Sequence, residues 1–267
     1  MPKIHVNGAE LYYEDEGAGP ETILFTHSLL LSGRMFDQQV AALKDRYRCV
    51  RFDFRGQGRS AVAASGYDID TLAEDAVAVI ETLDIAPCHY FGFSMGGFAG
   101  LRLGFRRPDL LRSLALIDTS ADPEPPENLP RYRLLNLLAR WLGPGTVAGQ
   151  VMPVLFGPDF MTNPNRAAER ASWQGQIAAN DPVGVTRAVK GVITRESVYD
   201  QIHNIPVPTL ILVGAEDAGT TPDHSERMHE RIPDSELVIV PGAGHMTPVE
   251  APQAVTAALE SFLTRVG

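Results

Sequence analysis

The sequence predicts an α/β fold in which a mostly parallel sheet carries helices on both faces. Short apolar runs, typical of strands buried on both faces, occur at 22–26, 49–54, 90–93 and 114–117. Segments with helical spacing lie between them, and this alternation is typical of parallel strands joined by helical crossovers. A chain of 267 residues with 44% hydrophobic residues is long and apolar enough for one large core.

The first 60 residues predict a hairpin followed by two buried strands. Residues 3–6 and 11–14 form short strand patterns joined at Asn7-Gly8, a pair that favours a tight hairpin turn. After a glycine and proline break at 17–20, strands at 22–26 and 49–54 flank a helix at 35–43. The glycine-rich turn at 55–60 lacks the G-x-x-x-x-G-K-[ST] pattern of a phosphate loop. We therefore interpret it as tight loop geometry.

The regular alternation continues through an amphipathic helix at 70–83 and a strand at 114–117, and then stops. Four prolines crowd 123–130, and 122–201 shows helical patterns at 132–142, 165–179 and 183–192 without strands. Strands then return at 208–213 and 236–240, with helices at 222–231 and 254–266. We expect a core built from 1–121 and 202–267, with 122–201 as a helical insertion that contains both tryptophans, Trp141 and Trp173.

The sequence Gly92-Phe93-Ser94-Met95-Gly96 lies between the strand that ends at Phe93 and a helix expected at 97–106. The pattern G-x-S-x-G in a strand–turn–helix context holds a serine in a strained conformation, with its hydroxyl projecting from the sheet edge. The flanking glycines are expected because a Cβ there would clash where strand and helix approach. Ser94 is thus the candidate nucleophile.

A serine nucleophile needs a base, and His245 is the best placed of the 7 histidines. It lies in the loop after the last strand, and all parallel strands end at the same sheet edge as Ser94. His27 also follows a strand and is the main rival. We favour a structural role for His27 because it directly precedes the candidate oxyanion loop.

An imidazole base needs an acid that holds its tautomer, and both Asp217 and Asp118 directly follow strands at this edge. Their positions in the chain alone do not decide which of the two is the acid. We favour Asp217 because its strand directly precedes, in the chain, the one that delivers His245. Asp118, followed by Thr119 and Ser120, has a ready use in a local cap or turn.

Five motifs together resemble those of the α/β-hydrolases along nearly the whole chain. They are H-S-L-L at 27–30, F-D-F-R-G-Q-G-R-S at 52–60, G-F-S-M-G-G at 92–97, G-A-E-D at 214–217 and G-A-G-H at 242–245. The resemblance implies an eight-stranded sheet, the triad Ser94–Asp217–His245, and a helical cap over the site. It also implies an oxyanion hole made by the backbone N–H groups of Leu29 and Met95. Within the superfamily, the chain is most similar to the 3-oxoadipate enol-lactonase-like and carboxylesterase group, although Ser28 stands where many relatives have glycine.

The implied activity is hydrolysis of a small to medium carboxylic ester or lactone through an acyl-enzyme, without a metal or organic cofactor. The insertion's aromatic and methionine side chains are compatible with an apolar pocket wall, or with packing against the core, which we favour for each of them. They are Trp141, Met152, Phe156, Phe160, Met161 and Trp173. Two alternatives stay open: a perhydrolase or haloperoxidase-like enzyme with the same triad, and a slow-turnover ligand receptor on the same fold.

Composition narrows the range of partners. A net charge of −10 disfavours nucleic acid and anionic membranes as partners, which leaves a small-molecule substrate and a homo-oligomer as open options. Cys49 and Cys88 both lie in apolar runs and are expected to be buried and free. The N-terminus lacks the apolar core of a signal peptide, and no apolar run approaches ~18 residues, so we expect a cytoplasmic protein without a membrane span.

Overall fold

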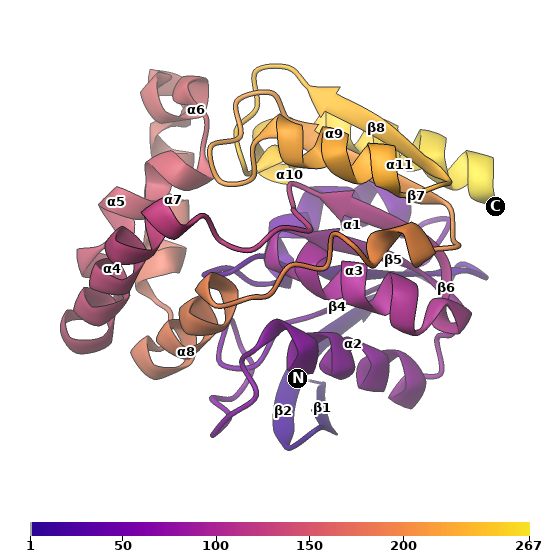
Figure 1. Cartoon of the computed structure of the whole chain (residues 1–267), viewed down its shortest axis with the longest axis horizontal. Helices are drawn as coiled ribbons and strands as arrows, with labels where there is room; N and C mark the ends of the chain where they lie inside the picture. The colour runs from indigo at the N-terminus through magenta and orange to yellow at the C-terminus, as the bar shows by residue number, and fades with distance from the viewer. Residues whose placement is uncertain (1) are drawn as a thin grey trace.

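Residues 2–267, which the computed structural model describes, form one eight-stranded sheet in the order β1-β2-β4-β3-β5-β6-β7-β8 (Figure 1). β1 and β2 pair antiparallel, as do β2 and β4, and the remaining pairs are parallel. The strands are β1 Lys3–Val6, β2 Ala9–Glu16, β3 Thr22–Thr26, β4 Arg48–Phe52, β5 Cys88–Phe93, β6 Leu111–Ile117, β7 Thr209–Gly214 and β8 Ser235–Val240. The predicted α/β class and mostly parallel sheet are confirmed.

Helices cover both faces of this sheet. Outside the insertion they are α1 Asp37–Leu43, α2 Ile69–Thr82, α3 Met95–Arg106, α9 Pro222–Arg231, α10 Thr247–Glu250 and α11 Pro252–Val266. Short 3-10 turns are η1 Gly33–Phe36, η2 Pro108–Leu110, η3 Pro126–Asn128, η4 Pro144–Thr146, η5 Pro164–Arg166 and η6 Ile202–Asn204. Buried side chains of α2, α3 and α9 form one hydrophobic cluster with the sheet, and those of α1 and α11 form a second.

The two clusters explain why the central strands are continuously apolar. Successive side chains of a strand point to opposite faces, so Tyr90 packs in the first cluster and Phe91 and Phe93 pack in the second. Neither face of β5 is left to solvent. The uninterrupted apolar pattern is therefore the direct signature of a strand between two helical layers.

Local signals set several boundaries. The hairpin turns at Asn7 and Gly8, both with positive φ (46° and 71°), and Val6 pairs with Ala9. Helix α2 begins after Asp68, whose carboxylate accepts the backbone N–H of Thr71 at 2.9 Å. β4 ends at Phe52, two residues before the predicted end.

Asp53 explains this early end of β4. One of its carboxylate oxygens accepts the N–H of Gly33 at 2.8 Å, and the other accepts the N–H of Arg59 at 2.8 Å. The chain therefore enters the loop at Asp53, whose side chain ties two neighbouring segments together.

Residues 122–201 form helices without a strand. These helices are α4 Leu129–Leu142, α5 Ala148–Leu155, α6 Pro158–Thr162, α7 Ala167–Ala178 and α8 Pro182–Ile193. Figure 1 shows them grouped beside one end of the sheet, apart from the helices that cover its faces. The sequence pattern did not predict α5 and α6, because both are short and α5 contains Pro153, a residue type that normally interrupts a helix. Burial of Met152, Leu155 and Phe160 in the second cluster favours these helices nonetheless.

Both tryptophans lie in this insertion, in different surroundings. Trp141 is 74% exposed on α4, close to the exposed Leu137 and Leu142. Trp173 on α7 is partly buried and lies with its ring centroid 6.4 Å from that of Phe156. No helix within residues 2–267 has the length and apolar character that crossing a membrane requires.

Candidate active site

Ser94 lies in the turn between β5 and α3 with a strained backbone. Its φ of 49° and ψ of −109° fall outside the regions that residues with a side chain prefer. Its N–H donates to the carbonyl of Ile117 at 2.8 Å, and its carbonyl accepts the hydroxyl of Thr119 at 2.8 Å and the N–H of Phe98 at 2.9 Å. These bonds hold the strained residue in place. Because the turn leads straight into helical backbone, α3 begins at Met95 and not at residue 97 as predicted.

The two glycines around Ser94 are required by close packing. A Cβ on Gly92 would lie 2.6 Å from the carbonyl oxygen of Gly96. A Cβ on Gly96 would lie 2.3 Å from the carbonyl oxygen of Thr26 in β3. Helix α3 thus sits so close to the sheet that only glycine fits at these positions.

His245 reaches Ser94 from the loop after β8. Its Nε2 lies 2.9 Å from the Ser94 hydroxyl oxygen. Its Nδ1 lies 2.8 Å and 3.0 Å from the two carboxylate oxygens of Asp217, in the loop after β7. His245 is buried, and its ring lies 5.2 Å from that of Phe93, centroid to centroid. The structure therefore brings the three sequence-predicted residues into one hydrogen-bonded chain.

The carboxylate of Asp217 is held by its own loop. One oxygen accepts the N–H of Gly219 at 2.7 Å and that of Thr220 at 2.9 Å, and the other accepts the hydroxyl of Thr220 at 2.9 Å. These bonds leave the carboxylate one orientation, toward His245.

Asp118, the rival acid, is buried beside this site. Among the residues that the structure describes, its carboxylate is hydrogen-bonded to Gly214 and Thr247 and not to His245. One oxygen accepts the N–H of Gly214 at 2.9 Å, and the other is hydrogen-bonded to the hydroxyl of Thr247. The expected local use in a cap or turn is wrong, because these bonds reach β7 and α10. Burial raises the pKa of the Asp118 carboxyl well above its ordinary value, and the negative charge of nearby Asp217 adds to the rise.

We predict that Asp118→Asn stabilises the protein increasingly as the pH rises above about 4. Between the ordinary carboxyl pKa and the raised pKa of folded Asp118, the folded state keeps a proton that the unfolded state has lost. The free energy of unfolding of the wild type therefore falls with pH, by at most about 1.4 kcal/mol per unit from this group. Asparagine carries no such proton, and its amide can still accept from Gly214 and donate to Thr247.

Melting temperatures from pH 4 to 8 measure this effect. Asp200→Asn is the matched control, because the Asp200 side chain is 96% exposed. The difference in melting temperature between Asp118→Asn and wild type should grow with pH, while that of Asp200→Asn should change little. A constant difference across this range would contradict the prediction.

His27, the rival base, uses both ring nitrogens in hydrogen bonds to the backbone. Its Nδ1 lies 2.6 Å from the carbonyl oxygen of Ser28, and its Nε2 lies 2.8 Å from the backbone nitrogen of Phe54, which donates to it. Burial lowers the pKa of His27, so its neutral form, with Nδ1 as donor and Nε2 as acceptor, suits both partners. This agrees with the structural role expected from the sequence.

A side chain that was not predicted from the sequence connects Met95 with the loop that contains Leu29. Gln57 is buried in the turn after β4. Its side-chain carbonyl oxygen accepts the N–H of Leu30 at 2.7 Å, and its side-chain amide nitrogen lies 3.8 Å from the Met95 sulfur.

The backbone around the candidate oxyanion donors does not require glycine at position 28. Leu30, not Ser28, takes the left-handed conformation (φ 69°), so serine at 28 needs no glycine-like backbone. Met95 opens α3, so its N–H has no acceptor within the helix.

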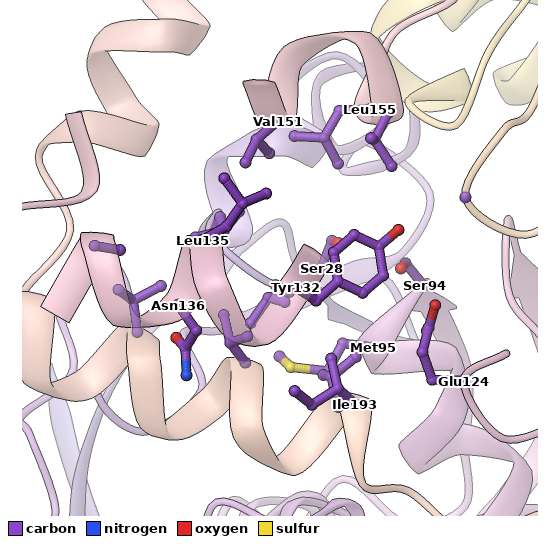
Figure 2. Close-up of a pocket in the computed structure, with 18 of the residues that line it drawn as sticks. Ser28, Ser94, Met95, Glu124, Tyr132, Leu135, Asn136, Val151, Leu155 and Ile193 are labelled. Carbon is purple, nitrogen blue, oxygen red and sulfur yellow. The ribbon is translucent and has the colours of Figure 1, made fainter. Parts of the chain in front are cut away.

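An apolar cavity of about 160 Å³ opens at Ser94, between the core and the insertion (Figure 2). Its insertion wall consists mainly of aliphatic side chains, among them Leu135, Val151, Leu155, Val185, Val189 and Ile193. Figure 2 shows the phenol of Tyr132 and the carboxylate of Glu124 close to Ser94.

None of the six aromatic and methionine residues considered for this wall lines the cavity. Phe156 and Phe160 instead stack on each other, 4.1 Å apart, within the second cluster, which confirms the packing interpretation for this pair.

Within residues 2–267, no three His, Cys, Asp or Glu side chains are grouped so that they could hold a metal ion. Cys49 and Cys88 are free and buried, as predicted. Burial raises the pKa of both thiols to about 12.

Comparison with known proteins agrees with this architecture. Residues 21–252 match the family model described as the alpha/beta hydrolase fold. A protein from Caulobacter sp. that carries the name of a carbamate hydrolase is 29% identical, over 95% of this chain and 96% of its own length. A thermophilic esterase from Thermogutta terrifontis is 30% identical, with a TM-score of 0.91 over 100% of this chain and 99% of its own. The enol-lactonase from Burkholderia xenovorans is 29% identical, with a TM-score of 0.92 over 98% of this chain and all of its own.

Proposed function

Because this chain belongs to the α/β-hydrolase family and is a hydrolase, we propose that it cleaves small to medium carboxylic esters or lactones through a serine acyl-enzyme. The observation that carries the proposal is the continuous hydrogen-bonded chain Ser94–His245–Asp217 at the mouth of an apolar cavity. The names of the esterase and the enol-lactonase support both substrate types.

Acylation begins with the Ser94 hydroxyl. At 2.9 Å from the hydroxyl oxygen, His245 Nε2 takes its proton as the oxygen attacks the substrate carbonyl carbon. Asp217 holds the proton on Nδ1 and stabilises the imidazolium that forms. The negative charge moves to the carbonyl oxygen, where the N–H groups of Leu29 and Met95 are the donors in this proposal. One such donor contributes on the order of 3 kcal/mol.

Loss of the leaving group completes acylation, and water then drives deacylation. His245 first gives its proton to the leaving alcohol, or to the ring oxygen of a lactone, and the acyl group stays on Ser94. It then takes a proton from water, whose oxygen attacks the acyl carbon, and the acid is released as Ser94 regains its hydrogen. A lactone keeps both halves in one product, a hydroxy acid. In this scheme the insertion acts as a cap, whose aliphatic wall holds the acyl group and limits access of water.

A substrate panel tests the proposal. The kcat/KM of p-nitrophenyl esters of increasing chain length, beside several lactones, should show repeated turnover that is lost in Ser94→Ala. The favoured acyl length follows from an apolar cavity of about 160 Å³ and should be short to medium. Absence of Ser94-dependent turnover on the whole panel would refute the proposal.

Two further observations separate the alternatives from this proposal. A perhydrolase or haloperoxidase-like enzyme would require peroxide as acyl acceptor and would drive peroxide-dependent halogenation of a dye. A receptor would bind one ligand tightly and release product extremely slowly after a single turnover.

A further inference from the structure

A buried ion pair stands at the polar end of the otherwise apolar cavity. Glu124 follows β6 at the start of the insertion, and Arg195 follows α8 at its end. Arg195 Nη1 lies 3.0 Å from Glu124 Oε2, and the two side chains are only 5% and 10% exposed. Both residues line the cavity that holds Ser94, and Figure 2 shows the Glu124 carboxylate directed toward Ser94.

Arg195 makes further contacts with the protein around it. Besides Glu124, it donates from Nε to the carbonyl of Asp122 at 3.0 Å and from Nη1 to the carbonyl of Val192 at 3.0 Å. Its guanidinium lies 4.3 Å from the ring centroid of Phe98. The other Glu124 oxygen accepts the amide of Asn128 at 2.9 Å.

These contacts determine which charges the cavity can receive. Among the described residues that line it, Arg195 is the one Lys or Arg and Glu124 the one Asp or Glu. The positive charge is thus already neutralised by an internal partner. A substrate carboxylate would meet the Glu124 carboxylate in an apolar site without a free cation, and an unpaired charge in such a site is strongly disfavoured.

We propose that this cavity selects uncharged acyl groups and lactones against substrates that carry a carboxylate, and that Glu124 determines this selection by neutralising Arg195. The inference rests on the proposed function, because it concerns the substrate of the same site. Glu124 is a specificity-determining residue in this scheme, not a catalytic one. The ion pair also ties the two segments that connect the insertion to the core, so the test must measure more than stability.

The test compares two ethyl esters of the same shape. Ethyl 6-methylheptanoate is uncharged, and monoethyl adipate carries a carboxylate in place of its branched end; ethanol release, coupled to an alcohol dehydrogenase, measures kcat/KM for each. The ratio of the two values does not depend on the fraction of folded enzyme. The wild type should favour the uncharged ester by roughly 100-fold, because like charges brought together at a binding surface cost several kcal/mol.

Glu124→Gln keeps the side chain's size and leaves Arg195 without its counter-charge, so it should lower this ratio by at least about tenfold. Glu127→Gln is the matched control: it removes the same charge from an exposed residue three positions along the chain, and its ratio should equal that of the wild type. The double variant Glu124→Gln/Arg195→Gln has neither charge and should restore the preference for the uncharged ester.

Each outcome is decisive. Equal ratios in the wild type and Glu124→Gln, or a wild type that accepts both esters equally, overturn the charge selection. The Glu124–Arg195 ion pair would then only connect the two segments that join the insertion to the core. A shift as large in Glu127→Gln assigns the effect to overall charge and also overturns it. If neither ester is hydrolysed, or if hydrolysis persists in Ser94→Ala, the proposed function fails and the selection fails with it.

Discussion

Ser94→Ala should reduce kcat for ester hydrolysis by about six orders of magnitude, as loss of the nucleophile does in a serine triad. Alanine leaves nothing to attack the carbonyl, and His245 and the candidate oxyanion donors can only hold the substrate. The fold should persist, because the backbone bonds of Ser94 to Ile117 and Phe98 do not involve the hydroxyl. The strained backbone stays the same, since alanine also carries a Cβ.

Steady-state kinetics with a p-nitrophenyl ester, beside a thermal melt, checks this expectation. Ser113→Ala is the control, because Ser113 is a buried serine in β6 whose hydroxyl bonds to His89, away from the candidate site. It should keep near-normal kcat. If Ser94→Ala retained more than about a thousandth of the wild-type kcat, Ser94 would not be the nucleophile.

Asp217→Asn should lower kcat by about four orders of magnitude. The N–H groups of Gly219 and Thr220 both donate to one oxygen of Asp217, so the amide oxygen of asparagine should take that position. The amide NH₂ then replaces the oxygen that lies 2.8 Å from His245 Nδ1. A donor there forces Nδ1 to accept, which places the ring proton on Nε2, and Nε2 can then no longer take the proton of Ser94.

Asp118→Asn is the matched comparison for this variant, because it makes the same chemical change one strand earlier. Its bonds go to Gly214 and Thr247, and the described contacts give it none to His245, so kcat should stay within about threefold of wild type. A large loss in Asp118→Asn together with a small loss in Asp217→Asn would assign the acid to Asp118.

The sequence predicted best what depends on local pattern and topology. Strands such as Thr22–Thr26 were recognisable because burial on both faces leaves an unbroken apolar run. Ser94, Asp217 and His245 lie together because each follows a parallel strand, and such strands end at one edge.

Residues whose role depends on distant contacts could not be predicted in this way. Gln57 lies in a turn whose glycines suggested only loop geometry, and its contact with Leu30 exists only after β3 and β4 have paired. Glu124 and Arg195 are 71 residues apart, and only the folded insertion brings them together. A single sequence carries no periodicity or motif that marks such a pair.

The location of the two tryptophans has a practical consequence for spectroscopy. Since Trp141 and Trp173 both belong to the insertion, intrinsic tryptophan emission monitors this part of the chain alone, whereas far-ultraviolet circular dichroism averages over every helix and strand. Denaturant titrations followed by both signals thus compare the insertion with the whole molecule without any added label. Coincident curves would mean that the insertion unfolds together with the sheet, and separated curves would mean that it unfolds as a distinct cooperative unit.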